Sequence, residues 1–172
     1  GERKADDILN TYSAENLQNV FSKYGELRNA KTLATTIVKE RRIRPIKTIG
    51  DLLTIIQPLI RGTRNKYLSQ VFQAIRIEVN EEIEALQDFL IAAKKVLRPE
   101  GRIVIMSYHS LEDRLVKNFF KSGNVSGELE KDFYGNINRP FRVITKKAMT
   151  ATDAELKRNP RSRSAKLRIA EK

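Results

Sequence analysis

A run of four consecutive apolar residues, Ile103-Val104-Ile105-Met106, constrains the fold of this chain more than any other feature. Alternate residues of a β-strand point to opposite faces, so a strand with this sequence presents apolar side chains on both faces. That pattern is typical of a strand inside a parallel sheet with helices above and below it. The run therefore predicts an α/β fold in which residues 103–106 form an interior strand with a neighbouring strand on each edge.

Helices are predicted on both sides of this strand. Asn80, Glu81 and Glu82 form an N-cap and an acidic first turn for a helix that extends to about residue 97. Ser110 is the predicted N-cap of the helix that follows the strand. The order helix, apolar strand, loop and helix is typical of the closing part of a doubly wound sheet.

The chain offers too few strands to complete such a sheet. Only two more strands are predicted, at residues 141–145 and 166–170, and we expect these two to pair. No strand is predicted before residue 102. The first residues, Gly1-Glu2-Arg3-Lys4, contain neither an apolar segment nor an initiator Met. We therefore expect a fragment of a larger protein in which the rest of the sheet lies upstream.

The first 80 residues predict short amphipathic helices. Ser13 is a predicted N-cap, and Thr48 with Asp51 three residues later is a predicted capping box. Because the pattern changes in kind near residue 80, we divide the chain into a helical domain of residues 1–78 and an α/β domain of residues 79–172.

Composition narrows the class of protein. No apolar run approaches the roughly 18 residues of a membrane span, so no membrane partner is expected. The chain has no Cys and one His, His109, which excludes disulfides, thiolate zinc sites and cysteine nucleophiles and makes a histidine metal cage untenable. We expect a metal-free protein of the cytoplasm.

The charge distribution indicates a polyanionic partner. The net charge is +12, and residues 139–172, with 11 basic and 3 acidic residues, carry +8 of it. In this region Arg161 and Arg163 follow a proline-stiffened turn, and their guanidinium groups suit contacts with RNA phosphates. A solvated basic loop is the alternative. The basic run at residues 39–47 is a second candidate, with the same alternative.

A cluster of polar residues lies where the apolar strand ends. Ser107, His109 and Ser110 occupy the junction between strand and helix, and in open α/β sheets the ligand crevice lies outside the carboxyl ends of strands. These three residues are therefore candidates for the border of a substrate pocket. The alternative is purely local: Ser110 caps the helix and His109 forms hydrogen bonds with its neighbours.

A second candidate surface lies on the segment that joins the two predicted domains. Gln73, Arg76 and Asn80 are spaced so that they share one helix face, which could contact a base edge, a phosphate or another domain. A structural junction is the alternative. The chain contains no glycine-rich phosphate loop, no G-x-S-x-G motif and no nucleophile paired with a base, so no catalytic or cofactor-binding residue is assigned.

Five segments together resemble a known family. In order and approximate spacing they are similar to the bacterial small-subunit ribosomal RNA cytosine-N4 methyltransferases of the MraW/RsmH type, and the resemblance covers nearly the whole chain. The segments are Asp6-Asp7-Ile8-Leu9-Asn10-Thr11, Lys23-Tyr24-Gly25-Glu26, residues 72–80 (FQAIRIEVN), residues 107–114 (SYHSLEDR) and residues 159–171 (NPRSRSAKLRIAE).

The resemblance implies the C-terminal part of a class I S-adenosylmethionine-dependent methyltransferase, with a Rossmann-like sheet and an all-α inserted domain that helps to recognise RNA. Members methylate the exocyclic amine of a cytidine in the decoding region of 16S rRNA in the small ribosomal subunit. The family's glycine-rich cofactor loop and ribose-binding acid have no counterpart here. The resemblance therefore implies a chain that lacks the N-terminal cofactor-binding half, binds S-adenosylmethionine poorly and transfers no methyl group.

On this interpretation Ser107, His109 and Ser110 border the substrate pocket, while Arg76, Arg161 and Arg163 contact RNA. Two other classes of function stay open: a non-catalytic RNA-binding or ribosome-assembly module, and an interaction domain with incidental basic charge. An uncovered sheet edge also invites pairing, so a homo-oligomer formed through that edge is a further expectation.

Overall fold

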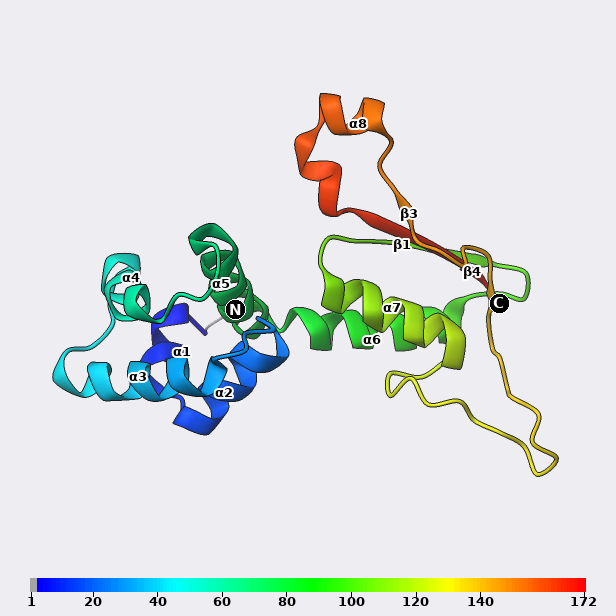
Figure 1. Cartoon of the computed structure of the whole chain (residues 1–172). Coiled ribbons are helices and arrows are strands. Elements are labelled where there is room, and N and C mark those ends of the chain that lie inside the picture. Colours follow the sequence, from blue (N-terminus) through cyan, green and yellow to red (C-terminus); the bar gives the residue numbers. More distant parts are fainter. Residues whose placement is uncertain (1–2) are drawn as a thin grey trace. The chain divides into compact units, whose positions relative to one another are not determined.

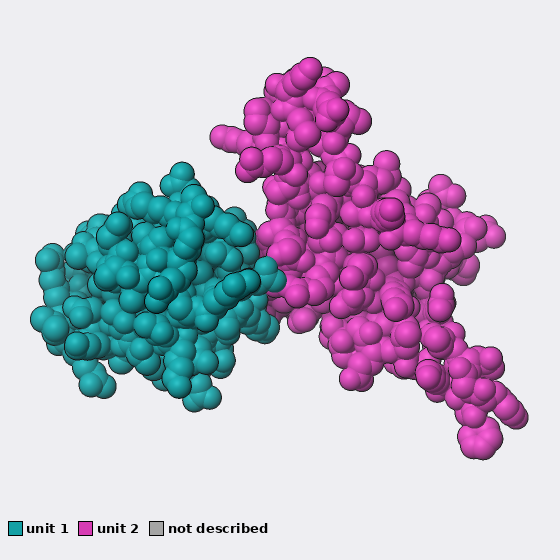
Figure 2. Space-filling model, in the orientation of Figure 1, with its two compact units in different colours: residues 1–82 teal, residues 83–172 magenta. Residues whose placement is uncertain are grey.

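The computed structural model describes residues 3–172 and separates the chain into two compact units, Gly1–Glu82 and Ile83–Lys172. Figure 2 colours these units teal and magenta. The expectation about the first residues of the chain rests partly on Gly1 and Glu2, which lie outside the described residues. Among the described residues, no helix is both long and apolar enough to cross a membrane.

Unit 1 is helical (Figure 1). Its elements are α1 (Ala5–Thr11), α2 (Ala14–Lys23), α3 (Ala30–Ile43), α4 (Ile49–Ile56), the 3₁₀ turn η1 (Gln57–Leu59) and α5 (Arg64–Asn80). The predicted caps are confirmed: the Ser13 hydroxyl accepts from the Asn16 N–H, and Thr48 forms a capping box with Asp51. α2 packs on α3 and α5 around fully buried apolar side chains that include Leu17, Phe21 and Leu33.

The boundary between α5 and α6 differs from the prediction. Asn80 is the last residue of α5 and does not cap α6 (Glu82–Val96). Glu81 separates the two helices with a left-handed backbone conformation (φ 50°). Polar residues favour both the ends and the starts of helices, so the sequence signal at residues 80–82 did not reveal which helix Asn80 belongs to.

Unit 2 combines two longer helices with a small antiparallel sheet (Figure 1). Beyond α6, its elements are β1 (Arg102–Ser107), α7 (Ser110–Ser122), β2 (Arg142–Val143), β3 (Met149–Thr150), α8 (Asp153–Arg158), the 3₁₀ turn η2 (Pro160–Ser164) and β4 (Lys166–Glu171). The strand order is β1-β4-β2, and β3 also pairs with β4. The expected pairing between residues 141–145 and 166–170 is confirmed by β2 and β4.

One face of the sheet carries the core of unit 2. Side chains of α6 and α7 pack there against β1, β4 and the residue before β2. The buried members of this cluster are Leu90, Ile103, Val116, Phe119, Phe120, Phe141 and Ala170. The two phenylalanines of α7 contact the Phe141 ring at centroid distances of 5.9 and 6.0 Å.

The apolar run forms a strand, as predicted, but that strand is not interior within residues 3–172. β1 pairs antiparallel with β4 along its whole length and stands at the edge of the sheet. Ile103 is buried, whereas Val104 and Met106, which point to the other face, are 57% and 51% exposed. Residues 3–172 therefore do not contain the second neighbouring strand and the covering elements that the sequence predicts, and the interior position of this strand stays a prediction. Hydrophobicity marks a face that favours burial, but not which segment covers it.

Candidate functional site

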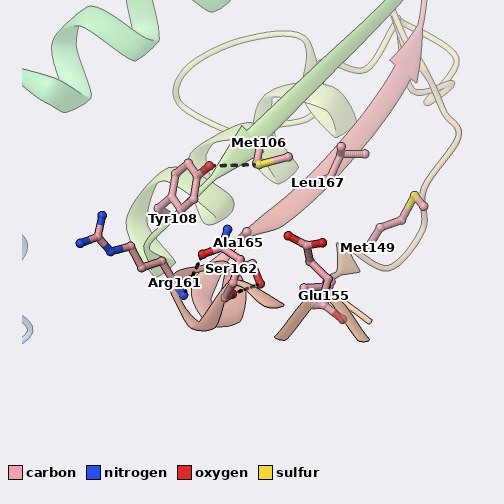
Figure 3. A pocket seen from close by; sticks show the side chains of 11 residues that line it. Met106, Tyr108, Met149, Glu155, Arg161, Ser162, Ala165 and Leu167 are labelled. Atoms are coloured by element: carbon pink, nitrogen blue, oxygen red, sulfur yellow. Dashed lines mark hydrogen bonds between the residues drawn. The ribbon is translucent and has the colours of Figure 1, made fainter. Parts of the chain in front are cut away.

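A cavity of about 660 Å³ lies beside the end of β1, on the open face of the sheet (Figure 3). Its apolar part comes from three strands, with Met106 of β1, Leu167 of β4 and Met149 of β3. Its polar part comes from α8 and η2. The remaining lining residues are Tyr108, Thr150, Ala151, Glu155, Asn159, Arg161, Ser162 and Ala165. An apolar floor with a few polar groups at its rim is the usual composition of a small-molecule site.

The register of the sheet explains why these side chains converge. Met106 lies opposite Leu167 in the β1–β4 pair, and Met149 lies opposite Leu167 in the β3–β4 pair. Directly paired residues of antiparallel strands project on the same face. Three flexible or branched apolar side chains therefore form one continuous floor. Tyr108 extends this floor at the end of β1, where its hydroxyl lies 3.3 Å from the Met106 sulfur.

Ser107 and Lys166 terminate the paired part of β1 and β4. Ser107 is 3% exposed and its hydroxyl donates to the Lys166 carbonyl at 3.3 Å. This side chain faces the helices, because Met106, its neighbour in β1, lines the open face. Ser107 therefore closes the strand pair on the side opposite to the cavity.

His109 is the N-cap of α7, a role that the sequence analysis assigned to Ser110. Its Nδ1 accepts from the Glu112 N–H at 3.3 Å, and its Nε2 lies 3.3 Å from the Glu112 carboxylate. Ser110 is instead the exposed first residue of the helix. His109 thus fixes the turn that carries Tyr108.

Glu112 completes this turn. Its carboxylate accepts from the Tyr108 N–H at 2.8 Å and from the His109 N–H at 3.3 Å. Burial alone would raise the pKa of Glu112, but the hydrogen bonds from His109 and Tyr108 outweigh burial, and the pKa is lowered. The ionised carboxylate stabilises the conformation in which the Tyr108 ring lies at the cavity.

Side-chain hydrogen bonds hold the basic turn η2, which carries Arg161 and Arg163, in a fixed conformation. The Asn159 side chain accepts from the Arg161 N–H at 3.3 Å, and the buried Ser162 hydroxyl donates to the Asn159 carbonyl at 2.7 Å. Arg161 lines the cavity, and its guanidinium extends away from the sheet in Figure 3. Arg163 is exposed on the same turn. Both guanidinium groups are therefore carried by a structured turn.

The three candidates on α5 all form hydrogen bonds with other residues of unit 1. The Gln73 amide donates to the Tyr24 carbonyl at 3.0 Å and so links α5 to the end of α2. Arg76 holds the Glu82 carboxylate through two hydrogen bonds of 2.8 and 3.0 Å, and Asn80 donates to the same carboxylate at 3.1 Å. All three belong to unit 1, whereas the cavity belongs to unit 2.

Several lining residues were not predicted. Met149 lies in a two-residue strand that has no detectable sequence period, and Glu155 lies in the short helix α8. Leu167 lies in the strand predicted at residues 166–170. Tyr108 was within the polar segment but was not singled out. Only the pairing of β3 and β1 with β4 brings these residues together.

The sequence of this chain is that of a methyltransferase family. The whole chain, residues 1–172, matches the family model described as the MraW methylase family, and the chain belongs to that family. It is 55% identical over 169 residues to the ribosomal RNA small subunit methyltransferase H of Phocaeicola vulgatus. The aligned region covers 98% of this chain and 56% of the relative.

Proteins of the same name in two other bacteria are similar to the same extent. The identity is 56% over 169 residues in Bacteroides thetaiotaomicron, covering 98% of this chain and 56% of the relative. It is 52% over 172 residues in Cytophaga hutchinsonii, covering 99% and 57%. The chain thus spans little more than half the length of these relatives. The resemblance found in the sequence is confirmed.

Proposed function

We propose that this chain is part of an S-adenosylmethionine-dependent enzyme of the cytoplasm that methylates N4 of a cytidine in the decoding region of 16S rRNA. The observation that carries the proposal is the match of all 172 residues to the MraW methylase family, together with relatives named as methyltransferases of small-subunit ribosomal RNA. The concentration of positive charge in residues 139–172 supports an RNA substrate.

The half-covered sheet supports a larger Rossmann-like domain. β1 has one unpaired edge, and its outer face exposes Val104 and Met106. A further strand on that edge and further elements on that face would bury these side chains, as in a doubly wound fold. On this proposal residues 1–78 are the inserted helical domain and residues 79–172 are the C-terminal half of the catalytic domain. The same edge would admit a second copy of the chain if nothing else covered it.

The residues around the cavity do not fit the cofactor. None of the cavity-lining residues is a glycine that would let a backbone approach the cofactor closely, and the one carboxylate, Glu155, pairs with Arg158. We therefore assign S-adenosylmethionine to the part of the enzyme that the longer relatives contain.

The cavity suits the substrate base instead. Its floor of Met106, Leu167 and Met149 can contact the flat face of a pyrimidine, and Tyr108 offers an aromatic ring beside it. A base that is stacked in RNA would have to be splayed out to reach the cavity. The cytosine amine is a weak nucleophile because its lone pair is delocalised, so precise positioning of the base would supply much of the catalysis.

On this proposal the residues singled out in the sequence have separate roles. Ser107 and His109 act on the pocket border indirectly: Ser107 closes the strand pair behind it, and His109 fixes the turn that carries Tyr108, while Ser110 begins the helix that follows. Arg161 and Arg163 contact RNA phosphates next to the cavity. Arg76 contributes from the helical domain, where Gln73 and Asn80 support the same helix.

The decisive experiment compares this chain with a polypeptide that spans the full length of its relatives. Both are incubated with radiolabelled S-adenosylmethionine and purified 30S subunits, and the modified nucleoside is identified by mass spectrometry. We expect N4-methylcytidine with the longer polypeptide only. No transfer by either would reject the enzyme proposal and favour a non-catalytic RNA-binding module. Micromolar binding of the cofactor by this chain in calorimetry would reject our assignment of the cofactor site.

A further inference from the structure

Unit 1 contains a cavity of its own, lined by basic residues. It has a volume of about 440 Å³ and lies between the turn that joins α2 to α3 and the turn that precedes α5. Its charged lining residues are Arg28, Arg61, Lys66 and Glu26. Three cationic side chains therefore share one opening with a single carboxylate, although the two turns are more than 30 residues apart in sequence.

A buried hydrogen-bond network holds the two turns together. Tyr67 is 2% exposed, and its hydroxyl donates to the Asn29 side chain at 3.2 Å. The Asn29 amide in turn donates to the Leu59 carbonyl at 2.9 Å. Asn29 belongs to the first turn, and Leu59 and Tyr67 flank the second. The network therefore fixes the backbone positions from which Arg28, Arg61 and Lys66 extend.

The cationic side chains are not neutralised by ion pairs within the part of the chain that the structure describes. No carboxylate oxygen of residues 3–172 forms a salt bridge with Arg28, Arg61 or Lys66, whereas other cations, among them Arg76 and Arg168, do form them. Burial raises the pKa of the Tyr67 hydroxyl, and Asn29 and the charge of Arg61 partly oppose this.

We propose that this cavity is a binding site for a phosphate group, either free phosphate or a phosphodiester of an RNA backbone. Arg28 and Arg61 offer planar guanidinium forks that match phosphate oxygens, and Lys66 adds a point charge with three donors. Positively charged side chains around a concave opening also raise the local concentration of anions. Glu26 opposes an anion and limits the affinity. The RNA source rests on the proposed function, whereas the phosphate site itself does not.

The site is tested by titrating the 172-residue chain with inorganic phosphate and recording backbone amide chemical shifts. We expect saturable shifts confined to residues 26–29 and 61–67. The double variant Arg61→Ala/Lys66→Ala should weaken phosphate binding at least fivefold, and Glu26→Gln should strengthen it. Lys117→Ala removes an exposed cation of α7 that does not line the cavity and is the matched control.

The outcomes separate a specific site from general attraction to a basic chain. Shifts spread over all basic surfaces without saturation, or equal weakening by the double variant and Lys117→Ala, would overturn the proposal. Thermal unfolding of each variant identifies any loss of fold, and Lys66→Glu, which reverses one exposed charge, provides a second variant with the same expected loss of binding.

A second titration distinguishes the source of the phosphate. A short abasic oligonucleotide presents phosphodiesters without bases. Shifts of the same amides at lower concentration than with inorganic phosphate assign the site to a nucleic-acid backbone, and a response to inorganic phosphate alone assigns it to the free anion. Methyl transfer by the full-length enzyme that survives loss of this site would leave the proposed function intact, and phosphate binding without methyl transfer would leave this site intact.

Discussion

At the scale of single residues, one buried charge network connects the C-terminal strand to the helix that follows the cavity. Asp113 of α7 and Arg168 of β4 are 8% and 7% exposed, and two hydrogen bonds of 2.7 and 3.2 Å join them. Lys166 adds a third contact to the same carboxylate at 3.3 Å. Arg168 is therefore an internal structural residue, although it lies among the basic residues that dominate the end of the chain.

Removing the carboxylate should be strongly destabilising. Asp113→Ala leaves the Arg168 guanidinium buried without its counter-charge, and we expect a loss of about 3–5 kcal/mol in the free energy of unfolding. Urea unfolding followed by circular dichroism measures it. The control is Arg102→Ala, which breaks a pair with Glu171 whose Arg side chain is 63% exposed, and should cost at most about 1 kcal/mol. Equal losses in the two variants would contradict this account.

The same network predicts a dependence on pH. Burial alone would raise the pKa of Asp113, but the hydrogen bonds and charges of Arg168 and Lys166 outweigh it and lower the pKa. A lowered folded-state pKa means that the stabilisation is complete above the unfolded-state pKa of about 3.9 and is lost as the pH falls through the folded-state value. Between about pH 5 and pH 2, stability should therefore fall more steeply in the wild type than in Asp113→Asn.

The measurement is the free energy of unfolding at several pH values in that range. Other carboxylates with lowered pKa values, such as Glu171, titrate in both proteins and cancel in the comparison. If the free energy of unfolding changed with pH equally in the two proteins, ionisation of Asp113 would not contribute to stability as proposed.

At the scale of secondary-structure elements, a glycine controls how closely two helices of unit 1 approach. A Cβ on Gly25 would lie 2.8 Å from the Phe21 carbonyl oxygen and 2.9 Å from the Gln70 carbonyl oxygen. Both are backbone atoms of α2 and α5, so neither can move without moving its helix. The hydrogen bond from the Gln73 side-chain amide to the Tyr24 carbonyl spans the same contact. Glycine here permits the packing of α2 on α5.

We expect Gly25→Ala to destabilise unit 1 by about 1–3 kcal/mol, the usual cost of an overpacked contact. Gly50→Ala is the matched control, because its Cβ would meet only the Thr48 hydroxyl at 3.5 Å and it lies inside α4. That substitution should be neutral or stabilise the chain by up to about 1 kcal/mol, since alanine favours helices. Thermal unfolding monitored at 222 nm distinguishes them. Stabilisation by both would show that the α2–α5 contact is loose.

At the scale of the whole molecule, charge is distributed unevenly between folded surfaces. The last 34 residues hold two thirds of the net charge of +12, yet part of it is internal, as with Arg168. Arg161 and Arg163 remain exposed on the turn beside the unit 2 cavity. If this turn binds RNA, these two residues account for a measurable part of the salt dependence.

Replacing Arg161 and Arg163 by Ala should flatten the dependence of RNA affinity on salt. Each single-strand phosphate contact contributes roughly 0.7 to the slope of log affinity against log salt, so the slope should fall by about 1.4. The measurement is filter binding of an RNA that contains the decoding-region sequence, at several salt concentrations. Arg98→Ala, an exposed cation at the end of α6, should leave the slope nearly unchanged. An unaltered slope in the double variant would remove this turn from the RNA surface.

Much of the secondary structure was predictable because its causes are local. The caps at Ser13 and Thr48 depend on residues three positions apart, and the strand at residues 103–106 follows from a continuous apolar run. The N-cap at His109 was missed because serine caps helices more commonly than histidine. The two-residue strand β3 was missed because it is too short to show a period.

By itself, the amino-acid sequence determined most of the helices, three of the four strands, the basic end of the chain and its membership of a methyltransferase family. Tertiary structure alone decided that β1 is an edge strand with one open face, that Met106, Met149 and Leu167 meet in one floor, and that Arg168 is buried against Asp113. The physical reason is the distance along the sequence over which each interaction acts. Caps and periodicities act within a few residues, whereas burial and charge pairing depend on which distant segments the fold brings together.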